Sequence, residues 1–241
     1  MTLSECMEVY GALLSFHGKR GWWPIPSRAG EHGFDGRGYH QGLPSCRPEP
    51  FDRLQICLGT ILTQNTSWNN AEKALLGLLD AGITDLPGLL RLSLPELEWA
   101  IRPSGYFRQK AARIKDLGKF LAAGGYLEIG KFPPAREALL SIRGIGPETA
   151  DSILLYAFHL PRFVIDAYTL RLFTRLGLLP AGSTYASAQE AFHSCLPSDA
   201  ELFSEYHALI VEACKVHCLK NSPECRACPL NASCSSSIRQ V

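Results

Sequence analysis

The chain has 241 residues, 46% of them hydrophobic and 20% charged, so it can fill a core and is not expected to be disordered. A formal net charge of +1 excludes a strongly basic protein, and any nucleic-acid contact must come from local basic patches. The sequence has no apolar run long enough to span a membrane, and its N-terminus lacks the basic segment that opens a secretory signal. We therefore expect a cytoplasmic protein with no membrane partner.

The spacing of apolar residues predicts helices along most of the chain. One helix is expected over about 4–16, and an irregular segment rich in Gly, Pro and His follows over 18–50. We interpret this segment as a long surface excursion. From Phe51 onward apolar residues recur at helical spacing, and prolines separate a series of short helices. Because few segments alternate apolar and polar residues, the sequence predicts an all-α fold.

Nine cysteines are present, and an odd number cannot form a closed set of disulfides within one chain. The last part of the chain carries the motif C-x6-C-x2-C-x5-C, formed by Cys218, Cys225, Cys228 and Cys234. Four thiolates can bind either an iron–sulfur cluster or zinc. Zinc ribbons usually have two CxxC knuckles on separate loops, whereas this motif has one, so the spacing favours iron–sulfur over zinc. Purely structural cysteines are the remaining alternative.

A glycine hairpin, Gly144-Ile145-Gly146, separates two predicted short helices, and Pro147 begins the second. Glycine permits a positive φ, and the unpaired amides at a helix start can bind a phosphate, with Arg143 beside them. An ordinary tight turn is the alternative interpretation. About twenty residues later, Asp166 precedes another helical run and could be its N-cap.

Taken together, the Gly-Ile-Gly hairpin, the Val-Ile-Asp sequence and the four-cysteine motif resemble the endonuclease III, or helix-hairpin-helix-GPD, superfamily of DNA glycosylases. The resemblance covers about 51–234. It implies two helical domains with a cleft between them: a six-helix barrel over 50–160, and an iron–sulfur cluster domain formed by 1–49 and 161–241. It also implies a 4Fe-4S cluster on the four cysteines and a nucleoid-associated monomer whose partner is double-stranded DNA with a damaged base.

The same resemblance implies roles for individual residues. Asp166 would stabilise the developing oxocarbenium ion and help to activate the nucleophile. The hairpin residues Gly144, Ile145 and Gly146, with Arg143, would grip the DNA backbone. Gln64 would fill the gap left by a flipped base. A shift of the alignment by one residue gives that role to Asn65, and both residues could instead simply end a helix.

One position departs from the bifunctional members of the superfamily. Those enzymes carry a lysine two residues after the second glycine of the hairpin, where this chain has Glu148, and no lysine occurs from Glu148 until Lys215. A carboxylate cannot form a Schiff base with the sugar, so we expect a monofunctional glycosylase that uses water, with weak or absent AP lyase activity. Glu148 could act as a second catalytic carboxylate or merely stabilise the helix dipole.

The sequence around the hairpin and Gln64 also resembles that of the branch related to 3-methyladenine DNA glycosylase III, which suggests alkylated purines as substrates. Such cationic bases stack on aromatic rings, and Trp22, Trp23, Trp68 and Tyr168 are candidate pocket walls. The alternatives are an endonuclease III-type glycosylase/AP lyase for oxidised pyrimidines, and a catalytically inert protein that binds damaged DNA. The candidate phosphate contacts are Arg143, Arg162, Arg171, Arg175, Lys215, Lys220 and Arg226.

Overall fold

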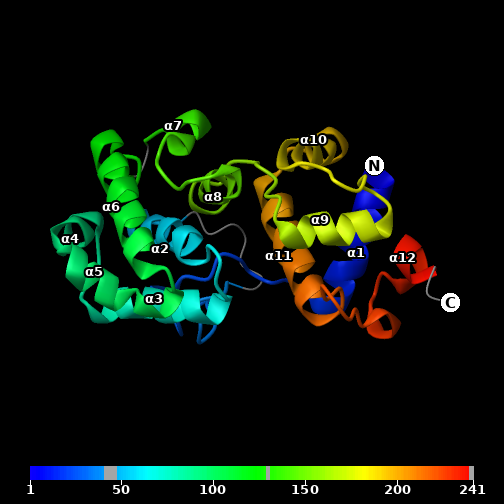
Figure 1. Ribbon diagram of the computed structural model, residues 1–241, viewed down its shortest axis with the longest axis horizontal. Coiled ribbons are helices and arrows are strands. Elements are labelled where there is room, and N and C mark those ends of the chain that lie inside the picture. Colours follow the sequence, from blue (N-terminus) through cyan, green and yellow to red (C-terminus); the bar gives the residue numbers. More distant parts are fainter. Residues whose placement is uncertain (41–47, 129–130, 239–241) are drawn as a thin grey trace. The chain divides into compact units, whose positions relative to one another are not determined.

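The computed structural model describes residues 1–40, 48–128 and 131–238, and every regular element in these ranges is a helix (Figure 1). The expected all-α fold is confirmed. In the described ranges, no helix combines the length and apolar character needed to cross a membrane. The chain divides into two compact units: Met1–Trp22 with Pro161–Val241, and Trp23–Leu160. The first is called the terminal unit and the second the barrel unit.

The barrel unit is built around α2 (Pro50–Leu62), which is buried from Leu54 to Leu62. A helix that is buried around its whole circumference belongs at the centre of a bundle. Helices α3, α6 and α8 and the π-helical turn η3 (Ile153–Ala157) pack against it. The helices of this unit after α2 are α3 (Trp68–Asp80), α4 (Leu86–Arg91), α5 (Leu94–Ala100), α6 (Phe107–Gly124), α7 (Arg136–Leu140) and α8 (Pro147–Ser152).

Two lysines of α6 satisfy carbonyl groups at helix ends. The Nζ atom of Lys110 donates to the carbonyl of Leu62 at 2.8 Å and to that of Ser104 at 2.7 Å. Burial lowers the pKa of Lys110 to about 8. Lys115 donates to the carbonyl oxygens of Leu89 and Leu90 in the last turn of α4 and to that of its C-cap, Leu92. Helix C-termini leave carbonyls without intrahelical partners, so both ammonium groups act as caps.

The described part of the irregular segment differs from the expected surface excursion at its start, because 23–26 are buried, whereas most of 29–37 is exposed. Trp23 and Ile25 are buried. The guanidinium of Arg28 makes a bidentate pair with Asp52 of α2, with its closest contact at 2.9 Å. These apolar and ionic contacts hold 23–40 in place around one short 3₁₀ turn, η1 (Pro26–Arg28), and they have no periodicity that the sequence could reveal. The observed boundary between the units lies after Trp22, whereas 1–49 was expected to belong with the C-terminal residues.

The terminal unit combines both ends of the chain. Its helices are α1 (Leu3–His17), α9 (Ala167–Leu176), α10 (Tyr185–Cys195), α11 (Ala200–Val216) and α12 (Ser235–Ile238). In Figure 1, α1 (blue) lies beside α11 (orange), against which it packs. The core is aromatic: Phe163 stacks on Phe192 at 3.9 Å between ring centroids, and Phe173 and Tyr206 pack edge-on around them.

Candidate nucleic-acid interface and catalytic residues

The hairpin joins α7 to α8 and depends on glycine at one position above all. Gly144 has φ +84°, and a side chain there would collide with that of Arg113. Gly146 is the N-cap of α8 with φ −92°, and the space around it is open. Ile145 is buried and anchors the turn. Gly144 is therefore required by both conformation and packing, whereas Gly146 leaves space above the helix start.

The hairpin exposes backbone donors at the start of α8. Within the described ranges, no group accepts a hydrogen bond from the amide of Gly144 or Gly146, and both residues are exposed. Pro147 occupies the first turn, as expected, and Arg143 is exposed on the preceding side. Unpaired amides at a helix start attract anions, because their N–H groups and the helix dipole both favour negative charge. This surface can therefore bind a phosphate group.

Gln64 lies directly behind the hairpin, and its whole amide group is engaged. Its Nε2 atom donates to the carbonyl of Gly144 at 3.1 Å and to Oγ1 of Thr149 at 3.0 Å. Its Oε1 atom accepts from Nη1 of Arg113 at 2.6 Å. Asn65 follows with φ +51° and an exposed side chain. In this arrangement Gln64 braces the hairpin, and Asn65 is the residue presented to solvent.

Arg113 is a site residue that the sequence analysis missed. It lies on α6, contacts Gln64, and occupies the space that a side chain at Gly144 would need. Its guanidinium therefore adds positive charge directly beneath the glycine hairpin. No local sequence pattern indicated this contact, because Arg113 and the hairpin are far apart in the sequence.

Asp166 is the N-cap of α9 in the terminal unit, as its position before the helix suggested. Its Oδ1 atom accepts from the amide of Thr169 at 2.7 Å and from Oγ1 of Thr169 at 2.9 Å. Its Oδ2 atom lies 3.5 Å from Nε2 of His207, and only 11% of its side chain is exposed. Burial alone would raise the pKa of Asp166, but the interactions with His207 and Thr169 lower it overall. The carboxylate is therefore held ionised in a largely desolvated place.

His207, on α11, links Asp166 to an aromatic side chain. The ring of Trp22 meets that of His207 edge-on, with 5.8 Å between centroids. The Nζ atom of Lys215 lies 5.9 Å from the centre of the Trp22 ring. Of the four candidate pocket walls, Trp22 is thus connected to the carboxylate through one intervening ring. Trp23 instead packs with Trp68 and Tyr156 in the barrel unit.

Glu148 lies in the first turn of α8 and is exposed. This position suits a carboxylate that stabilises the helix dipole. Its part in catalysis stays a prediction. Lys110, a barrel lysine with a lowered pKa, is 1% exposed and donates to two carbonyls, so its amine is not available to a substrate.

The four cysteines of the motif line one cavity of about 270 Å³ in the terminal unit. A hydrogen bond from Cys214 and the positive charge of Arg175 lower the pKa of Cys218 to about 5, although burial opposes them. In the described ranges, no three His, Cys, Asp or Glu side chains are arranged around a single metal ion. Cysteine thiolates are the ligands that hold iron–sulfur clusters in proteins. An all-thiol donor set around one cavity fits an iron–sulfur cluster.

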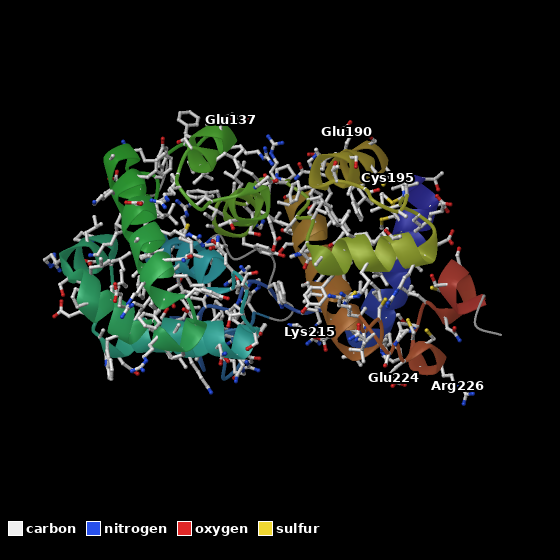
Figure 2. All side chains as sticks on the ribbon, in the orientation of Figure 1. Glu137, Glu190, Cys195, Lys215, Glu224 and Arg226 are labelled. Carbon is white, nitrogen blue, oxygen red and sulfur yellow. The ribbon has the colours of Figure 1, made fainter. Side chains whose placement is uncertain are left out.

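Two of the candidate phosphate contacts instead support the loop that carries these cysteines. Arg171 donates from Nε to the carbonyl of Cys218 at 2.8 Å. Arg175 donates from Nη1 to the carbonyl of Leu219 at 2.7 Å and to Sγ of Cys218 at 3.3 Å. Figure 2 shows Glu224 and Arg226 on this loop, with the Arg226 side chain pointing away from the ribbon. Both guanidinium groups of α9 are therefore committed to the cysteine loop.

Comparison with known proteins identifies the class to which this arrangement belongs. Residues 58–198 match the family model described as HhH-GPD superfamily base excision DNA repair protein. Protein MJ1434 of Methanocaldococcus jannaschii, provisionally named a DNA repair glycosylase, is 37% identical over 95% of each chain. Endonuclease III of Thermotoga maritima is 32% identical over 76% of this chain and 83% of its own.

A solved structure extends the similarity to three dimensions. The 3-methyladenine DNA glycosylase MagIII of H. pylori, bound to 1,N6-ethenoadenine, is 25% identical and matches with a TM-score of 0.66. The match covers 88% of this chain and 95% of MagIII. The chain therefore belongs to the HhH-GPD superfamily of base excision DNA repair proteins, and the resemblance inferred from its motifs is confirmed.

Proposed function

We propose that this base excision repair protein is a monofunctional DNA N-glycosylase that removes a damaged base with water as the nucleophile. The proposal rests on the side chains at two positions, the first turn of α8 and Asp166. The position expected to hold the Schiff-base lysine is Glu148, and the buried carboxylate of Asp166 stays ionised. A carboxylate can stabilise a positively charged sugar and accept a proton from water, but it cannot form an imine.

In this proposal the barrel unit binds the DNA backbone through the amides of Gly144 and Gly146, helped by Arg143. Gln64 and Arg113 hold the hairpin in its binding conformation, and Asn65 fills the gap left by the flipped base. Asp166 then stabilises the oxocarbenium ion as the glycosidic bond breaks, and it helps to orient the attacking water. The partner is double-stranded DNA that contains a damaged base.

We further propose alkylated purines as the substrate class. Alkylation gives the purine a positive charge and weakens its glycosidic bond, so an aromatic wall and a carboxylate supply most of what removal requires. Trp22 is linked through His207 to Asp166, which places a ring close to the carboxylate within the terminal unit. The similarity to MagIII, solved with 1,N6-ethenoadenine bound, also favours a modified purine.

The four motif cysteines would hold a 4Fe-4S cluster in this protein. Bound there, the cluster would fix the loop after α11 through four iron–thiolate bonds. The purified protein is then expected to be brown, with visible charge-transfer absorption and bound iron and sulfide. Cys225→Ala should lose that absorption, whereas Cys57→Ala, a buried cysteine of the barrel unit, should keep it. A colourless protein that contains zinc would overturn the assignment.

The function is tested with a panel of duplexes, each with one lesion, scored for base release with and without alkali. A monofunctional enzyme releases the base but cuts the strand only after alkali. Borohydride trapping on each duplex provides the discriminating measurement, because a covalent adduct requires an imine. A trapped adduct and release of oxidised pyrimidines would instead support an endonuclease III-type glycosylase/AP lyase. The sequence similarity of this chain to endonuclease III of Thermotoga maritima makes that class the alternative.

The substrate class has its own test in Trp22→Ala, assayed on an alkylated purine and on an uncharged lesion. Loss of the ring should lower kcat/KM by roughly tenfold for the cationic base and less for the neutral one. Trp99→Ala provides the control, because Trp99 is 73% exposed on the barrel unit. Equal losses for both lesions would mean that Trp22 has only a structural part.

A further inference from the structure

Two cysteines outside the motif lie against each other in the terminal unit. The Sγ atoms of Cys6, on α1, and Cys195, the last residue of α10, are 2.9 Å apart, although the residues are separated by 189 positions. Apolar atoms in ordinary contact are about 3.5–4.0 Å apart, and a disulfide bond is about 2.0 Å long. The two thiols are thus close enough to bond after a small rotation of either side chain.

The backbone around both thiols is held in place by other contacts. The hydroxyl of Tyr206 donates to the carbonyl of Cys6 at 2.7 Å, which fixes α1 against α11. One turn before Cys195, Phe192 stacks in the aromatic core on Phe163. The approach of the two sulfurs therefore follows from packing that involves neither of them. Figure 2 shows Cys195 at the end of α10, where α1 also lies.

The two thiols differ in access to solvent. Cys6 is fully buried, and burial raises the pKa of its thiol above the ordinary value. Cys195 is half-buried and is therefore the more accessible of the two residues. In the described ranges, no third His, Cys, Asp or Glu side chain joins them to complete a metal site. A pair of thiols with one reachable member suits a disulfide that forms from outside and is then protected.

We propose that Cys6 and Cys195 form a disulfide bond that ties the N-terminal helix to α10. The terminal unit is assembled from two segments separated by the whole barrel unit, and its N-terminal helix is held to the later segment by noncovalent contacts such as the hydrogen bond from Tyr206. A covalent link between its segments restricts the unfolded chain over a very long loop, where the effect is largest. Six cysteines would then serve two separate functions: the four of the motif line the cavity, and the other two form this bond.

The bond can form by exchange with a small-molecule disulfide, RSSR. The thiolate of Cys195 attacks one sulfur, forms a mixed disulfide and releases RS⁻. The thiol of Cys6 then attacks Sγ of Cys195, loses its proton as the new bond forms, and displaces the second RS group. The two protein thiols are oxidised, RSSR is reduced to two RSH, and the two protons from the protein thiols end on the released thiolates.

The test begins with holoprotein purified without reductant. The protein is denatured in iodoacetamide, digested and mapped by mass spectrometry, before and after exposure to oxidised glutathione. We expect a peptide pair that joins Cys6 to Cys195 and separates on reduction. If both cysteines are fully alkylated even after oxidised glutathione, the proposal is overturned.

The second measurement is the Tm with and without reductant. The wild-type Tm should fall by roughly 10 °C on reduction, and Cys195→Ala should have a lowered Tm that reductant does not change. Cys57→Ala, which removes a buried thiol of the barrel unit, should keep the full response to reductant. The visible absorption of any bound cluster is followed in the same samples. An unchanged wild-type Tm, or an equal response in Cys195→Ala, would contradict the proposal.

Discussion

The two units present their functional groups in different ways. In the barrel unit the candidate DNA contact is backbone, the amides of Gly144 and Gly146, held in position by the side chains of Gln64 and Arg113. In the terminal unit the candidate catalytic group is a side chain, the carboxylate of Asp166, which is held by a backbone amide and by His207. A backbone site depends on conformation and tolerates few substitutions at the turn. A side-chain site depends on its electrostatic environment. Substitutions should therefore damage the two units differently.

The largest stability effect is expected at the hairpin. Gly144→Ala should cost about 2–3 kcal/mol of unfolding free energy, because alanine is strained at φ +84° and its methyl group would displace Arg113. Gly146→Ala should change stability by less than about 0.5 kcal/mol, since its surroundings are open. Chemical denaturation measures both variants. Equal costs at the two glycines would mean that Arg113 does not shape the turn.

Measuring the DNA affinity of Gly146→Ala distinguishes an effect on DNA binding from an effect on folding. Gly146→Ala should fold normally yet bind DNA about tenfold more weakly, because its methyl group would occupy the space that a phosphate needs. The dissociation constant, measured at one fixed salt concentration, is the readout. Wild-type affinity in this variant would remove the hairpin from the proposed interface.

A smaller effect is expected behind the hairpin. Gln64→Ala should lose about 1–2 kcal/mol of stability, because the carbonyl of Gly144 and the guanidinium of Arg113 each lose a partner. Asn65→Ala should leave stability almost unchanged but should slow base release, since its exposed side chain is the one proposed to fill the gap. Denaturation and single-turnover kinetics distinguish the two roles. The reverse pattern would return the gap-filling role to Gln64.

The smallest change at neutral pH is expected for His207→Gln. The pKa of Asp166 is below its ordinary value partly because of His207, so removing the imidazole should raise it. As the pH falls, base release should therefore be lost at a higher pH in the variant than in the wild type. In the wild type, the stability that Asp166 contributes is present above its unfolded pKa and is lost as the pH falls through its lowered folded pKa.

The control for His207→Gln is His32→Gln, which replaces an exposed histidine of the barrel unit. Coincident acid limbs would show that His207 does not set the charge of Asp166.

Local patterns predicted local structure well. The helix expected over 4–16 is observed as Leu3–His17, Pro147 begins α8, and Asp166 caps α9. These features depend on neighbours within one helical turn. The contacts of Arg113 and His207, and the pairing of Cys6 with Cys195, join residues that are distant in sequence and have no periodicity to reveal them.

The two glycines of the hairpin illustrate the same limit. Both were expected to use their conformational freedom, yet only Gly144 has a positive φ, whereas Gly146 has φ −92°. The sequence pattern located the turn, but not the different places of its two glycines: Gly146 is the extended N-cap of α8, whereas Gly144 has a positive φ and lies against Arg113.

The proposed catalytic role of Asp166 is tested most directly by Asp166→Asn in single-turnover base release from an alkylated duplex, with DNA affinity measured in parallel. Asparagine preserves size and can still cap α9, so the fold should be retained. We expect release to slow by roughly 10²–10⁴-fold while affinity stays within about threefold of the wild type. An unchanged release rate would contradict the proposal, because no charge at position 166 would then be needed to break the bond.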